Sequence, residues 1–172
     1  MRRHNGMRPQ DIVILLKIIA MGNHPWQLKD LAQSLFISPS EVSESLNRSV
    51  LAGLIDHRKK RVNRQAFYEF LVHGLPYVFP QEPGRISNGM PTAHAHPAFR
   101  KSIVAQELYV WPDLESKERG AHIEPLYPNQ AKAARQDEQL YLLLALVDML
   151  RVGKLREKKL ATKELEKILL HE

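Results

Sequence analysis

Five basic side chains fall within seven positions of the first third of the chain: Arg58, Lys59, Lys60, Arg61 and Arg64. Closely spaced Lys and Arg attract polyanions, above all the phosphates of nucleic acids. The 172-residue chain has a net charge of +6, and the excess is unevenly spread. Residues 1–74 hold 11 Lys or Arg against six Asp or Glu, whereas residues 75–125 hold five against six. We therefore expect the N-terminal segment to meet double-stranded DNA or another polyanion.

A group of polar side chains precedes this basic stretch: Ser40, Ser43, Glu44, Asn47 and Arg48. Val42, Leu46 and Val50 recur every four residues between them, which predicts a helix with that polar group largely on its outward face. Hydroxyl, amide and guanidinium groups on one exposed helix face can form hydrogen bonds with base edges and phosphates.

Local signals predict where this helix and its neighbours begin. Ser38 followed by Glu41 is a capping box, and Pro39 suits the first helical position, so the helix should start there and end near Gly53. Apolar spacing predicts earlier helices over 9–21 and 26–35, and a later one over about 64–73 that Asn63 caps.

The segment from Leu31 to Leu46, LAQSLFISPSEVSESL, therefore contains two short helices joined by a turn of about four residues. It resembles the helix-turn-helix of winged-helix transcription regulators, the MarR-like group in particular, over about residues 9–64. The resemblance implies that the second helix enters the major groove of DNA and that the basic stretch stands where these proteins keep their wing. Ser40, Ser43, Glu44, Asn47 and Arg48 would then meet bases and phosphates, and the five basic residues would meet phosphate or the minor groove.

Three features depart from that family pattern. Phe36 stands where the turn usually has Gly, so the turn must avoid a positive φ or carry strain. Glu41 and Glu44 place acids on the recognition helix, where phosphates disfavour them. No paired-strand wing is obvious, and residues 57–64 read as a short basic loop that leads into a helix.

The expected fold is mainly α with a small β-hairpin, in three parts. A winged-helix-like module covers 1–74, a Pro-rich segment with the hairpin covers 75–128, and helices fill 129–172, at about 129–152 and 154–170. Residues 80–98 should be a long loop, and the hairpin should pair strands at about 103–111 and 120–126.

Two stretches contain more apolar residues than the surface of a monomer would carry. Residues 12–19 are apolar on more than one face, and 140–150 form a nearly continuous apolar run. Each is either core or an interface with a second subunit. The resemblance implies a homodimer, because two-fold pairing doubles a short DNA site, and these stretches could supply its interface.

The residues give little support for a metal site, a catalytic site or a ligand pocket. The chain has no Cys, which excludes disulfides and thiolate zinc sites. His94 and His96 lie in a Pro-rich loop without a metal motif, and His122 with Glu124 is an equally weak pair, so we expect solvated histidines, no metal and no cofactor. No catalytic motif is present, so an enzyme is not expected. Tyr109, Trp111 and Tyr127 are either core aromatics or the lining of a ligand pocket.

The remaining expectations concern location and partners. The longest apolar run, from Ile12 to Met21, is interrupted by Lys17 and is too short to span a bilayer, so we expect a cytoplasmic protein without a membrane partner. The expected function is a DNA-binding repressor or activator. The alternative is an antitoxin-like or adaptor protein whose C-terminal part holds a toxin-like protein partner.

Overall fold

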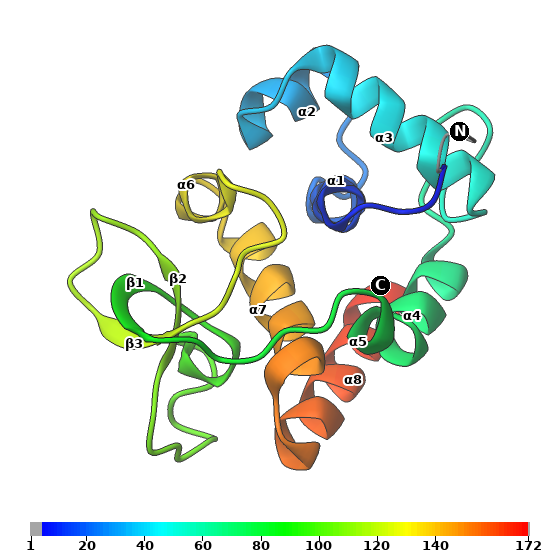
Figure 1. Ribbon diagram of the computed structural model, residues 1–172. Coiled ribbons are helices and arrows are strands. Elements are labelled where there is room, and N and C mark those ends of the chain that lie inside the picture. Colours follow the sequence, from blue (N-terminus) through cyan, green and yellow to red (C-terminus); the bar gives the residue numbers. More distant parts are fainter. Residues whose placement is uncertain (1–4, 172) are drawn as a thin grey trace.

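The computed structural model describes residues 5–171, which are mainly helical with one small three-stranded sheet (Figure 1). The helices are α1 (Pro9–Ala20), α2 (Leu28–Leu35), α3 (Pro39–Leu51), α4 (Arg64–His73), α5 (Leu75–Val78), the 3-10 turn η1 (Ala93–Ala95), α6 (Gln130–Arg135), α7 (Glu138–Val152) and α8 (Leu155–Leu170). The strands are β1 (Ile86–Thr92), β2 (Tyr109–Pro112) and β3 (Arg119–His122).

The predicted N-terminal helices are confirmed to within about two residues at most ends. Ser38 and Asn63 cap α3 and α4 through their side chains, as the local signals indicate. Figure 1 shows α1 nearly end-on, between α3 and α7, and α1 also contacts α2.

α1 is a core helix. Residues 12–16 are completely buried within one chain, so this stretch has no surface left for a second subunit. The apolar run on α7 is buried in the same way, with Leu140, Leu143 and Leu146 all inaccessible to solvent. The apolar surplus of both stretches is therefore used inside the chain, and neither supplies a dimer interface.

The sheet differs from the predicted hairpin. β2 and β3 run parallel to each other, with Tyr109 opposite Ala121, and each pairs antiparallel with β1. The C-terminal half of β1 pairs with β2 and its N-terminal half with β3, so the three strands close on themselves. The hairpin prediction is wrong, and so is the prediction of a loop over 80–98, which contains β1.

Two glycines permit this tight closure. A Cβ at Gly89 would lie 2.1 Å from the carbonyl oxygen of Trp111, and one at Gly120 would lie 2.4 Å from that of Leu108. Both distances are far below van der Waals contact, so any side chain would push the strands apart.

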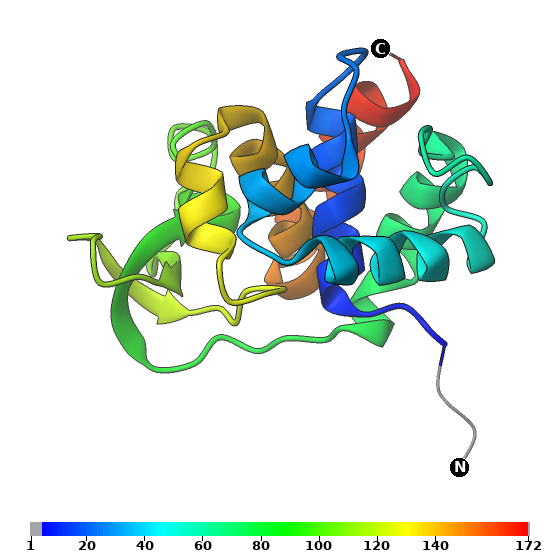
Figure 2. The same ribbon diagram turned by 90° about the horizontal axis from the view of Figure 1, so that it is seen from above.

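The three predicted segments share one hydrophobic core. α7 contacts α1 and also η1 and β1, while α8 packs against α4 and α7. In Figure 2 the chain between α5 and β1 runs extended along one edge, from the helical part to the sheet. Within residues 5–171, no helix is both long and apolar enough to cross a membrane.

Candidate nucleic-acid interface

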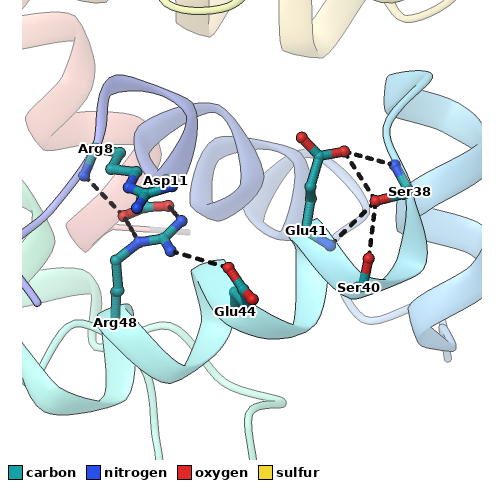
Figure 3. Close-up of polar contacts among 7 residues, drawn as sticks. All are labelled: Arg8, Asp11, Ser38, Ser40, Glu41, Glu44 and Arg48. Atoms are coloured by element: carbon teal, nitrogen blue, oxygen red, sulfur yellow. Dashed lines mark hydrogen bonds and ion pairs between the residues drawn. The ribbon is translucent and has the colours of Figure 1, made fainter. Parts of the chain in front are cut away.

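The N-terminus of α3 is held by a reciprocal capping box (Figure 3). Ser38 Oγ accepts from the Glu41 amide at 3.2 Å, and the Glu41 carboxylate accepts from the Ser38 amide at 3.0 Å. The hydrogen bond from the Ser38 amide lowers the pKa of Glu41. The Glu41 charge is thus engaged at the positive end of the helix dipole.

The turn before α3 carries strain at Phe36, one of the two outcomes that the sequence leaves open. Phe36 has φ 56° and ψ 42°, a left-handed conformation that costs an L-residue about 1–2 kcal/mol. Later parts of the chain hold it there. Asn129 donates to the Phe36 carbonyl at 3.0 Å, Tyr127 donates to the Leu35 carbonyl at 2.9 Å, and the Lys132 ammonium lies 4.0 Å from the Phe36 ring centre.

The outward side of α3 carries four of the five polar residues singled out above. Ser40, Glu44 and Asn47 are exposed, and Ser43 is half-buried. Hydroxyl and amide groups thus line the accessible side of a 13-residue helix whose opposite side packs on α1 and α2.

Arg48 does not belong to this outward side, so the expectation that it lies on the exposed face of the helix is wrong. Its side chain is only 12% exposed, and Nε and Nη2 donate to the Asp11 carboxylate at 2.8 and 2.7 Å (Figure 3). Asp11 is completely buried and also accepts from the Arg8 amide at 2.8 Å. This ion pair raises the pKa of Arg48 and joins α3 to the first turn of α1. A more distant contact, at 4.0 Å, links Arg48 to Glu44.

The loop 56–61 follows α3, and we call it the wing after the position that the MarR-like resemblance implies for it. Ile55 and Val62 form a single antiparallel bridge that closes the loop 56–61. The Asp56 carboxylate accepts from the amides of Lys60 and Arg61 at 2.7 and 2.9 Å, which lowers its pKa. Lys59 takes φ 57° at the tip. The basic loop is therefore an ordered turn, closed by one bridge in place of the paired strands of a full wing.

The wing residues point their charges in different directions. Arg58 and Arg61 are exposed. The Lys59 ammonium donates to the Asn47 side-chain oxygen of α3. Lys60 lies over the Trp26 ring, 4.2 Å from its centre, and donates to the Trp26 carbonyl at 3.0 Å. The contact between Lys59 and Asn47 places the wing directly beside the polar side of α3.

Arg64 is separate from this cluster, in contrast to the expectation from sequence. Its Nη1 donates to the carbonyl of Ile168 at 3.0 Å and more weakly to that of Leu169 at 3.4 Å, near the end of α8. A cation there complements the negative end of the α8 dipole. Arg64 therefore ties α4 to α8.

The histidines and aromatics take structural positions. His94 and His96 are 4% and 8% exposed, so the expectation that these two are solvated is wrong. The side chain of His122 is 35% exposed and lies 2.9 Å from the carboxylate of Glu124. Trp111 and Tyr127 are core residues, whereas Tyr109 lines a cavity. No three His, Asp or Glu side chains of residues 5–171 gather as metal ligands would.

Sequence reasoning missed Asp11 as the partner of Arg48, because an acid in the first turn of a helix is already accounted for by the dipole of that helix. It also missed the supports of the turn at residues 127–132, which lie about 90 positions later in the chain. No family model, curated protein or solved structure matches this chain.

Proposed function

We propose that this chain binds double-stranded DNA at specific sequences and regulates transcription, with α3 in the major groove and the loop 56–61 on the adjoining phosphates. The observation that carries the proposal is the hydrogen bond from Lys59 to Asn47, which sets a basic loop against the polar side of a capped helix. The likeness of Leu31–Leu46 to MarR-like winged-helix regulators supports it.

The polar groups of α3 and those of the wing suit the two tasks of a DNA-binding protein, which are to recognise bases and to bind phosphates. Amide and hydroxyl side chains on α3, namely Asn47, Ser43 and Ser40, suit base edges, for which Asn is a preferred partner of adenine. Guanidinium groups at the wing, on Arg58 and Arg61, suit phosphate oxygens and fix position without reading sequence.

The acids on α3 are compatible with this proposal because both have partners within the chain. Glu41 is held by Ser38, and Glu44 lies 4.0 Å from the guanidinium of Arg48. The repulsion between these carboxylates and the phosphates of DNA is therefore weaker than the sequence indicates. Glu44 can still accept a hydrogen bond from the amino group of cytosine.

A homodimer remains part of the proposal on the ground of DNA geometry alone. A single recognition helix reads only a few base pairs, and a two-fold site doubles that number. The interface must lie outside the apolar stretches of α1 and α7, which are buried within one chain. Those stretches are equally closed to the toxin-like protein partner of the alternative interpretation.

The experiment is a selection of genomic fragments with the purified full chain, in the presence of excess competitor DNA, followed by footprinting of the enriched sites. The proposal predicts one recurrent motif, with two half-sites spaced by whole turns of DNA if the protein is a dimer. A parallel selection uses Asn47→Ala, which should lose the motif while the fold is retained. Recovery of the same random fragments by both proteins would contradict sequence-specific binding.

A further inference from the structure

The turn between α2 and α3 is a Schellman motif with phenylalanine at the position where such motifs usually have glycine. The amide of Ile37 donates to the carbonyl of Ala32 at 3.1 Å, and the amide of Phe36 donates to that of Gln33 at 3.4 Å. These two bonds enclose the left-handed Phe36, a conformation that an L-residue adopts about tenfold less readily than the right-handed one. Only Ile37 separates Phe36 from Ser38, the N-cap of α3. The conformation of Phe36 therefore sets the direction in which α3 leaves the turn.

Two side chains from a distant segment hold this conformation. A helix leaves its last carbonyl groups without partners of its own. Here the Tyr127 hydroxyl donates to the carbonyl of Leu35 at 2.9 Å, and the Asn129 amide donates to that of Phe36 at 3.0 Å. The two accepting carbonyls belong to the peptide groups on either side of the Phe36 Cα. Since φ and ψ of Phe36 determine how these peptide groups are oriented, the pair of bonds selects one backbone conformation. The Lys132 ammonium adds a contact with the Phe36 ring.

The segment that supplies these donors is itself fixed. The amide of Leu126 donates to the Gln130 side-chain oxygen at 3.0 Å, and Arg151 of α7 donates to the carbonyl of Glu124 at 3.2 Å. Figure 1 shows α6 close to α2, and the two helices are in contact. Tyr127 is 3% exposed, and burial raises its pKa, so the hydroxyl keeps the proton that it donates. The donors thus form a rigid support rather than a flexible surface contact.

We infer that Tyr127 and Asn129 are positioning residues for α3. Their paired hydrogen bonds, which we call the turn clamp, hold Phe36 in its left-handed conformation and so set the angle at which α3 is presented. Sequence-specific DNA binding by residues 1–74 then requires a segment from the C-terminal half of the chain. This consequence for DNA rests on the proposed function, whereas the turn clamp itself does not.

The first test needs no DNA. A positive φ brings the amide and α protons of a residue close together, so nuclear magnetic resonance of the full-length protein should show a strong Overhauser effect between these protons of Phe36. The double variant Tyr127→Phe/Asn129→Ala should weaken it. Tyr141→Phe is the matched control, because it also removes a hydroxyl that donates to a backbone carbonyl, that of Pro91. An undiminished effect in the double variant would overturn the turn clamp.

The second test measures affinity for a selected DNA site at a temperature where circular dichroism shows every variant to be folded. Tyr127→Phe/Asn129→Ala should weaken binding about tenfold or more, the loss expected for two hydrogen bonds, and Tyr141→Phe should bind as the wild type does. Adding Phe36→Gly to the double variant should restore most of the affinity, because glycine adopts the left-handed conformation without the clamp. Equal losses in the double variant and Tyr141→Phe, or no recovery with Phe36→Gly, would contradict a positioning role.

The two tests separate failure of the inference from failure of the proposed function. If the wild-type chain selects no DNA site, the proposed function fails, and the turn clamp is decided by the Phe36 signal alone. If the double variant loses the Phe36 signal and keeps its affinity for a selected site, DNA binding stands and the positioning role of Tyr127 and Asn129 is overturned.

Discussion

Arg48 of α3 forms a two-pronged ion pair with Asp11 of α1, through hydrogen bonds of 2.8 and 2.7 Å. The carboxylate is completely buried, and the guanidinium side chain is 12% exposed. Asp11 in turn accepts from the Arg8 amide, so one carboxylate both caps α1 and positions the candidate recognition helix. The orientation of α3 therefore depends on a group three residues into the first helix.

Replacing Arg48 with Ala should destabilise the protein by about 3 kcal/mol, because it leaves the Asp11 charge buried without its partner. Urea denaturation followed by circular dichroism measures this loss. The double variant Asp11→Leu/Arg48→Met removes both charges and should be more stable than Arg48→Ala. A loss below about 1 kcal/mol in Arg48→Ala, together with weaker binding to a selected DNA site, would return Arg48 to the DNA-facing side.

The position of Arg48 shows that the sequence alone does not determine how wide the buried side of a helix is. Val42, Leu46 and Val50 identify the inward stripe of α3, but Ser45 and Ser49 of the same helix are also completely buried. These small residues widen the inward side, and Arg48, three positions after Ser45, falls at its edge. The spacing of apolar residues alone does not reveal that Asp11, a buried acid of α1, lies beside Arg48.

The helices were predictable because their caps and periods are local, whereas the sheet was not. β1 contains Gly89 and Pro91, which both disfavour strands, and its pairing with β2 and β3 joins segments far apart in the sequence. β2 and β3 have only four residues each, too few for a clear period. β2 and β3 are aligned in parallel because both pair with β1. Since β1 lies outside residues 103–126, the residues of that segment alone do not reveal this arrangement.

The wing arginines should set the salt dependence of DNA binding. Arg58→Ala/Arg61→Ala should lower the slope of log affinity against log salt by about two if each contacts one phosphate, with similar losses on specific and random DNA. Fluorescence anisotropy at several salt concentrations measures the slope. Lys159→Ala/Lys163→Ala is the control of equal charge on α8, and identical slopes for the two variants would argue against a phosphate contact at the wing.

Asn47 should contribute to sequence discrimination rather than to general affinity. Asn47→Ala is expected to cost about 1–3 kcal/mol on a selected site and less on random DNA, because base-edge hydrogen bonds are lost. Competition binding with both DNAs separates the two effects. Gln65→Ala, at an exposed position on α4, is the neutral control. Equal losses on both DNAs would exclude Asn47 from base readout and reduce its role to holding Lys59.

Asp148 should be the residue that joins the sheet to the helices. It is completely buried and accepts from Thr92 Oγ1 at 2.7 Å, from Trp111 Nε1 at 2.6 Å and from Arg151 Nη1 at 3.0 Å. Asp148→Ala leaves the buried Arg151 with the backbone carbonyls of Phe79 and Glu124 but without its carboxylate partner, and should cost about 3–5 kcal/mol. Chemical denaturation followed by tryptophan fluorescence measures it.

The control for Asp148 is Glu138→Ala, which removes an exposed acid from the first turn of the same helix. It should cost less than about 1 kcal/mol, the contribution of a surface charge to a helix dipole. A similarly small loss in Asp148→Ala would mean that the Thr92, Trp111 and Arg151 contacts do not hold the sheet against α7.

His96 should make the protein less stable in mild acid. Burial, with a smaller contribution from Arg100, lowers the pKa of His96 to about 4 from an ordinary value near 6.5. Between these two values the unfolded chain holds a proton that the folded chain lacks. The free energy of unfolding therefore falls as pH drops through this window, by at most about 1.4 kcal/mol per pH unit from this one group.

His96→Gln removes the titration, so the difference in stability between wild type and variant should shrink as the pH falls from about 7 toward 5. Urea denaturation at successive pH values measures that difference. His57→Gln, at an exposed position of the wing, should instead parallel the wild type. Parallel curves for wild type and His96→Gln would show that His96 takes up its proton without unfolding cost, and that its contact with the Tyr141 ring, at 4.1 Å between centres, tolerates the charged imidazolium.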